Sequence, residues 1–107
     1  MSKTSLGLEE NVEALLAYLL GWITGIIFLL LEKESRFVRF HAMQSIIVFL
    51  SITLLQAILP IIPFIGGLFS MLLGVLAFVL WIVLMVKAYQ GEYYKLPIAG
   101  DLAENYL

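Results

Sequence analysis

The stretch EKESRFVRFHAMQS, residues 32–45, lies between two long apolar parts of the chain and decides how the chain is organised. It contains both acids and all three basic residues of the middle of the chain, together with the only histidine. The residues on either side are almost all Leu, Ile, Val and Phe. A polar island of this kind predicts a loop at a membrane surface, where its basic residues help to set the orientation of the neighbouring helices.

The composition favours a membrane protein. Of the 107 residues, 63% are hydrophobic and 13% are charged, whereas soluble domains carry about 25% charged residues. A soluble chain of this length could not bury so much apolar surface. The absence of cysteine excludes disulfides and thiolate sites, and no basic patch with interleaved aromatic residues indicates nucleic-acid binding.

Three apolar segments are long enough to form membrane helices. The first, residues 14–31, is uncharged and meets the requirement of about 17 to 25 residues. Residues 40–86 carry no formal charge if the histidine is neutral, but one helix of this length would measure about 70 Å. The prolines and glycines of PIIPFIGG, residues 60–67, predict a reversal. We therefore expect a single all-α membrane domain with transmembrane helices at 14–31, 40–59 and 67–86, and tails at 1–13 and 87–107.

Basic residues predict the orientation of this arrangement. Three spans would put the N-terminal tail and the 60–67 turn on one face, and the island and the C-terminal tail on the other. The first face would hold only Lys3, and the second would hold the other five basic residues. Because basic residues favour the cytoplasmic side, we expect a multi-pass cell-membrane protein with its N-terminus outside, its C-terminus cytoplasmic, and a polar cytoplasmic cap built from the island and the tail.

Small residues mark two possible helix-packing faces. Gly21 and Gly25 are four residues apart in the first segment, and Ser70 and Gly74 have the same spacing in the third. Such spacing allows close approach of helices in lipid, although glycine is also common in membrane helices without this role. The pattern leaves open whether these faces pack within one chain or join two chains.

One side of the second segment is polar. His41, Gln44, Ser45 and Gln56 fall within about 120° of one another on a helix. A buried amide in lipid needs a partner, so this side predicts either hydrogen bonds between helices or a solute pathway. A lone histidine without a second His or Cys is a poor metal ligand. Because no acid lies in any span and no catalytic motif is present, we expect no enzyme activity, no cofactor and no metal.

The C-terminal stretch YQGEYYKLP, residues 89–97, is a second polar cluster. Tyr93 and Tyr94 suit the membrane interface. Glu92 could pair with Arg36 or Arg39 and tie the tail to the island, although simple interfacial anchoring is an alternative. Lys33 and these two arginines could also contact anionic lipid headgroups.

YLLGWITGIIFLLLEKESRFVRFHAMQS, followed by VKAYQGEYYKLPIAGDLAE, resembles the Tic-twenty-like family and its small prokaryotic membrane-protein relatives. FVRFHAMQS at 37–45 and GEYY at 91–94 carry the resemblance, which covers about residues 15–105. The family is named for a small membrane subunit of the translocon in the inner chloroplast envelope, so the resemblance implies a role related to polypeptide translocation.

The function expected from the sequence is therefore that of a small non-enzymatic membrane scaffold or assembly subunit. Three helices enclose little interior, so we expect self-association or another membrane protein as partner, in addition to the lipid bilayer. The alternative is a homo-oligomeric channel lined by the polar side of the second segment.

Overall fold

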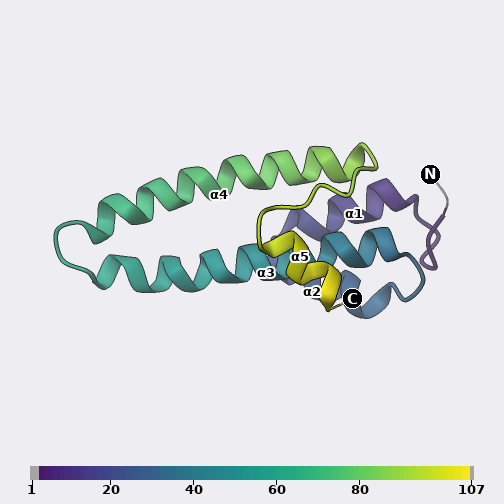
Figure 1. Ribbon diagram of the computed structural model, residues 1–107, viewed down its shortest axis with the longest axis horizontal. Helices are drawn as coiled ribbons and strands as arrows, with labels where there is room; N and C mark the ends of the chain where they lie inside the picture. Colours follow the sequence, from purple (N-terminus) through teal and green to yellow (C-terminus); the bar gives the residue numbers. More distant parts are fainter. Residues whose placement is uncertain (1–2, 107) are drawn as a thin grey trace.

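The computed structural model describes residues 3–106 and is built from helices (Figure 1). No strand is present in this part of the chain, where the only extended pairing is a single bridge between Lys3 and Glu9. The elements in chain order are α1 (Glu10–Leu19), α2 (Trp22–Leu31), α3 (Arg36–Ile58), the short 3-10 helix η1 (Leu59–Ile61), α4 (Gly66–Tyr89) and α5 (Ala99–Asn105).

Helices α3 and α4 form a long antiparallel hairpin (Figure 1). With 23 and 24 residues, they measure about 35 Å each, enough to cross a hydrocarbon core of about 30 Å. Both are apolar enough to be candidate membrane spans. The chain reverses in the proline- and glycine-containing stretch that predicts the turn. There Gly66 is required because a Cβ atom would lie 2.1 Å from the carbonyl oxygen of Leu59.

The first expected span is not a single helix, so the prediction of one transmembrane helix over 14–31 is wrong. Gly21, with a φ of 65°, ends α1 and reverses the chain, and α2 returns beside α3 (Figure 1). Each helix of this hairpin has 10 residues and measures about 15 Å, half the thickness of a hydrocarbon core. We call α1 and α2, with the turn between them, the short hairpin.

The expected separation of the N-terminal tail from the island and the C-terminal tail is also wrong. Because the short hairpin returns, the beginning and the end of the chain lie at the same end of the molecule (Figure 1). The Asn11 amide donates to the Tyr89 carbonyl oxygen at 3.0 Å, and the Ser35 hydroxyl donates to Glu10. Every charged residue of the described chain lies in 3–13, 32–39 or 87–104, so the charges collect at this end.

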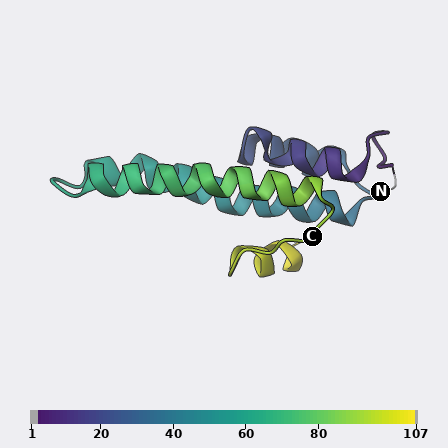
Figure 2. The same ribbon diagram turned by 90° about the horizontal axis from the view of Figure 1, so that it is seen from above.

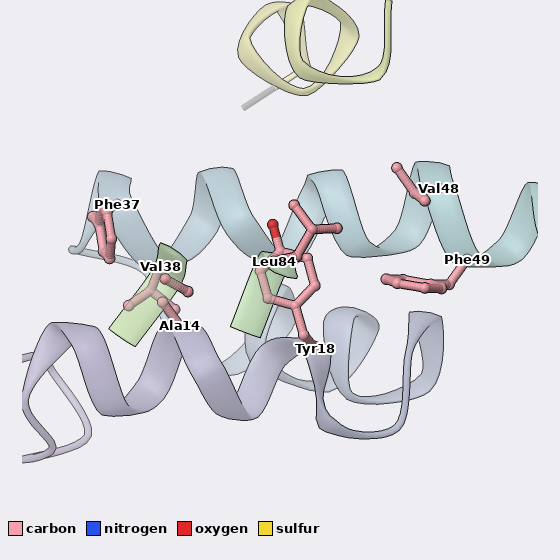
Figure 3. Packing of buried hydrophobic residues seen from close by; sticks show 8 residues of the cluster. Ala14, Tyr18, Phe37, Val38, Val48, Phe49 and Leu84 are labelled. Atoms are coloured by element: carbon pink, nitrogen blue, oxygen red, sulfur yellow. The ribbon is translucent and has the colours of Figure 1, made fainter. Parts of the chain in front are cut away.

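The hydrophobic core lies in the charged half of the molecule. Figure 3 shows Ala14 of α1 facing Val38 of α3, and Tyr18 of α1 pointing toward α3 beside Leu84 of α4. Helix α5 packs on the side of α3 opposite α1 (Figure 2). Between Phe49 and Leu84 the long hairpin has no buried hydrophobic side chain. Five helices therefore occupy the charged half, and only the long hairpin occupies the other half.

Candidate functional site

The densest polar cluster in the molecule joins α1, α3 and the C-terminal tail. The Tyr18 hydroxyl lies 2.7 Å from His41 Nδ1, and Gln44 Nε2 donates to the Tyr18 oxygen at 2.9 Å. The other ring nitrogen of His41, Nε2, lies 2.8 Å from the carbonyl oxygen of Glu92. All three of these side chains are fully buried. We call them the Tyr18–His41–Gln44 network.

The partners of this network fix the positions of its protons. A carbonyl oxygen can only accept, so His41 Nε2 carries the proton that binds Glu92. In a neutral ring Nδ1 then has to accept, and the Tyr18 hydroxyl donates to it. Tyr18 in turn accepts from Gln44, so each polar atom has a complementary partner. The network is therefore a closed set of hydrogen bonds around a neutral histidine.

The network also holds the C-terminal tail against α3. Gln44 donates to the Tyr94 carbonyl oxygen at 2.9 Å and accepts from the backbone N–H of Leu96 at 3.1 Å. The Tyr93 ring packs edge-on against Phe37, with centroids 4.9 Å apart. Three backbone groups of the tail, at residues 92, 94 and 96, thus bind side chains of one helix.

The prediction that Glu92 pairs with Arg36 or Arg39 is wrong. Glu92 pairs with Lys87 at 3.2 Å, and Arg36 lies 3.9 Å from Glu104. The Arg39 guanidinium donates to the carbonyl oxygens of Leu29 and Glu32, both at 2.8 Å. Arg39 thus satisfies carbonyl groups at the end of α2, where a helix leaves its last acceptors unpaired.

The basic residues of the island surround a shallow surface cavity. Its volume is about 190 Å³, and its lining consists of Lys33, Glu34, Arg36 and Arg39. Three basic residues and one acid give this cavity a net positive charge. This arrangement is compatible with the anionic headgroup contact expected from the sequence, which stays a prediction.

The turn of the short hairpin has its backbone groups satisfied by side chains. Thr24 Oγ1 accepts from the N–H of Leu20 at 3.0 Å and donates to the carbonyl oxygen of Ala17 at 3.1 Å. The Ser45 hydroxyl of α3 donates to the carbonyl oxygen of Gly21 at 2.8 Å. From α4, the Trp81 indole donates to the carbonyl oxygen of Tyr18 at 2.8 Å. Such internal pairing is what a turn inside a hydrocarbon layer requires.

The small residues have distinct positions. A Cβ atom on Gly25 would lie 2.9 Å from the carbonyl oxygen of Ala42, so glycine allows α2 to approach α3 closely. Gly21 forms the turn of the short hairpin. In the far half, Gln56 donates to the Ser70 carbonyl oxygen at 3.0 Å and accepts from the Ser70 hydroxyl. Gly74 lies beside this pair, with its Cβ position 3.4 Å from the Gln56 amide nitrogen.

Sequence reasoning missed a buried pair of acids at the base of the short hairpin. Glu13 and Glu32 are fully buried, and one oxygen of each has no hydrogen-bond donor. Burial raises the pKa of Glu13 from 4.5 to about 7. Burial also acts to raise the pKa of Glu32, but hydrogen bonds to its carboxylate, first from the Ser35 backbone N–H and then from the side chains of Ser5 and Glu13, outweigh burial and lower this pKa to about 2. A protonated Glu13 can donate to an ionised Glu32, which satisfies both acids.

The sequence contained only an indirect signal for this pair. Glu9, Glu10 and Glu13 precede an apolar helix, a position where acids interact favourably with the helix N-terminus. Only the reversal at Gly21 brings α2, and with it Glu32, back to the start of α1. Within residues 3–106 no three His, Asp or Glu side chains are grouped so that they could hold a metal ion.

Comparison with known proteins identifies the family. The magnetosome magnetite crystal formation protein family matches residues 9–103. The chain belongs to this family. A UPF0132 membrane protein of Methanocaldococcus jannaschii is 58% identical over 106 residues, covering 99% of this chain and 96% of the relative. A second one from that organism is 56% identical over 95% of this chain and 73% of its own length. One from Archaeoglobus fulgidus is 53% identical over 92% of this chain and 95% of the relative. No solved structure matches.

These matches correct the resemblance and support the membrane assignment. The assignment to the Tic-twenty-like family is wrong, because the matching family is a different one and none of the relatives carries that name. Relatives that match nearly the whole chain are named membrane proteins, so this member of the family is a small membrane protein as well.

Proposed function

We propose that the protein is a non-enzymatic membrane scaffold with two transmembrane helices, α3 and α4, and a short hairpin that enters one leaflet from the charged end. The internal hydrogen bonding of the hairpin turn carries this assignment. Thr24, Ser45 and Trp81 supply partners that water would supply for a turn at the surface. Leu19 and Leu20, at the tip, are 44% and 62% exposed, so the tip needs hydrocarbon around it.

The charges orient this arrangement with the N-terminal and C-terminal segments both in the cytoplasm. All six Lys and Arg residues lie in the three segments that form the charged end. The turn between α3 and α4 has no charged residue between 40 and 86. This arrangement has six basic residues on one face and none on the other, whereas the three-span arrangement has five and one. Under the positive-inside rule the first distribution orients the molecule more strongly.

A scaffold role fits the way in which the polar side chains are used. His41, Gln44 and Ser45 bind the tail or the short hairpin, and Gln56 binds Ser70. The polar side of α3 is thus occupied by structural hydrogen bonds and offers no continuous row of groups for a solute. The family description refers to magnetite crystal formation.

Single-cysteine labelling tests the topology, because the chain has no native cysteine. Leu6→Cys and Asp101→Cys, both at exposed positions, are expected to react with a membrane-impermeant maleimide only after the cytoplasmic side is opened. Leu20→Cys is expected to stay unlabelled from both sides. Labelling of Leu6→Cys in intact cells would contradict this topology.

Crosslinking in native membranes tests the scaffold role. A photoreactive group at Leu30, which is 62% exposed on α2, is expected to give a reproducible protein adduct, either with a second copy or with another membrane protein. Recovery of the monomer alone, from this position and from exposed positions on α4 such as Phe78, would contradict a scaffold. Ion flux through liposomes that depends on Gln56 would support a channel instead.

A further inference from the structure

The distribution of helices along the long axis makes the molecule wedge-shaped. From this shape we propose that the protein recognises and promotes membrane curvature in which the leaflet at its charged end is convex. This inference rests on the proposed leaflet insertion of the short hairpin. It adds an activity that a scaffold does not need, since a cylindrical molecule could also hold neighbours together.

The asymmetry follows from the lengths of the helices. The long hairpin extends through both halves of the molecule, whereas α1 and α2, with 10 residues each, reach only about 15 Å from their base. Figure 2 shows the short hairpin on one side of the long hairpin and α5 on the other, both confined to the charged half. The molecule is 50 Å long and 22 Å and 21 Å across, so the added helices widen a narrow body at one end.

The added area is large relative to the part that spans the membrane. A helix is about 10 Å in diameter, so α1 and α2 add about 160 Å² of cross-section to one leaflet. The long hairpin occupies a similar area in each leaflet, and the short hairpin therefore doubles the protein cross-section on the charged side. A leaflet that contains more area than its partner bends outward, which makes the charged side convex.

The outer face of the short hairpin is suited to displace lipid chains. Ile23 and Ile27 are 47% and 44% exposed, and Leu30 is 62% exposed. These apolar side chains follow one another along α2 and continue the exposed surface of the tip. They require contact with acyl chains, which places the volume of the hairpin among the lipids of that leaflet.

The short hairpin is also braced against deformation, which a wedge needs in order to transmit force to the lipids. Two bonds fix its turn to the long hairpin, from Ser45 on α3 and from Trp81 on α4, and Thr24 of α2 closes the turn from within. Gly25 brings α2 against the backbone of α3 at Ala42. The hairpin is therefore part of the folded body, and the lipids rather than the hairpin have to adjust.

The test uses both orientations that reconstitution produces. Protein with Asp101→Cys is reconstituted by detergent removal into vesicles of mixed size, which are then separated by diameter. An impermeant maleimide reports the fraction of molecules whose charged end faces outward, where the outer leaflet is convex. We expect this fraction to rise as vesicle diameter falls. A fraction that does not change with diameter in the otherwise unmodified protein would overturn the inference.

A variant directed at the wedge sharpens this test. Leu20→Lys places a charge at the tip of the short hairpin, where it is costly in hydrocarbon, while the side chain it replaces is exposed and outside the core. The size dependence is expected to be lost. The control is Leu102→Lys, which makes the same charge change outside the hairpin, on α5 at a position 38% exposed. This variant is expected to keep the dependence of orientation on vesicle size. Equal size dependence in both variants would contradict a wedge formed by the hairpin.

A depth measurement separates failure of this inference from failure of the scaffold topology. A fluorophore on Leu20→Cys in large vesicles is quenched by lipids that carry quenchers at known depths. A tip near the bilayer centre with no size-dependent orientation overturns the curvature activity and leaves the scaffold topology in place. A tip at either headgroup layer overturns both.

Discussion

Replacement of Gln44 by Leu should release the C-terminal tail from α3 while leaving the helices in place. Leucine has a similar size, so the shape of the core is preserved. The substitution removes two bonds that connect α3 to the tail, to the Tyr94 carbonyl oxygen and from the Leu96 N–H. It also removes the donor to Tyr18, which still binds His41.

The size of the effect follows from the two tail bonds. Each hydrogen bond between uncharged groups contributes about 0.5 to 1.5 kcal/mol. Their combined loss of about 1 to 3 kcal/mol corresponds to an increase of about 5- to 150-fold in the opening of residues 92–98. The bond from His41 to Glu92 remains, so the beginning of the tail should stay closer to its native protection than Leu96.

Hydrogen exchange of the protein in lipid nanodiscs, followed by mass spectrometry, measures this opening. Exchange should accelerate in peptides that contain Leu96 and stay unchanged in the middle of α4. Gln56→Leu is the matched control, because it removes the bonds to Ser70 far from the tail. Unchanged exchange at Leu96 in Gln44→Leu, or equal acceleration in both variants, would refute the assignment of Gln44 as the anchor of the tail.

Three further predictions concern the short hairpin. Gly25→Ala should lower the free energy of unfolding by about 1 to 3 kcal/mol, because its Cβ would lie 2.9 Å from a carbonyl oxygen of α3. The control is Gly67→Ala, which has open space around it and should leave the thermal unfolding midpoint unchanged or raise it. Thr24→Val should cost about 1 to 3 kcal/mol, because it removes the hydroxyl that donates to the buried Ala17 carbonyl oxygen and accepts from the Leu20 N–H. Thr53→Val, which only loses a bond to its own helix, should cost less in the same denaturation assay. Because the pKa of Glu13 is raised to about 7, the folded state binds this proton more tightly than the unfolded state, so its contribution to stability is lost as pH rises from 4.5 to 7. Unfolding midpoints measured across this range should show that loss, and Glu13→Gln should reduce it; an identical pH profile in the variant would contradict a protonated Glu13.

The long hairpin was predictable because its signals are local. Uncharged length identifies the two helices, and Pro60, Pro63 and the following glycines identify the turn. The observed start of α3 differs from the predicted one for an equally local reason. Helix α3 begins at Arg36 rather than at residue 40 because the Ser35 side chain accepts a hydrogen bond from the N–H of Val38 at 3.2 Å, which caps the helix.

The short hairpin was missed because its evidence is not local. A segment of 18 apolar residues fits a transmembrane helix by length, and a glycine inside it fits a packing face as well as a turn. The decisive feature is the positive φ of Gly21, which no residue type reveals by itself. The partners that make the turn possible, Ser45 and Trp81, lie 24 and 60 residues further along the chain, so the pattern around Gly21 does not contain them.

The role of the polar side of α3 also depends on the short hairpin. As part of a three-span bundle, a row of His41, Gln44 and Ser45 would face other helices or a channel. In the folded chain Ser45 binds the hairpin turn, and His41 and Gln44 each bind both Tyr18 of the hairpin and the backbone of the tail. A single hydrogen bond between membrane helices is weak, about 0.6 kcal/mol on average, so several of them are needed to fix two short elements to one long helix. That requirement accounts for the concentration of polar side chains in the first half of α3.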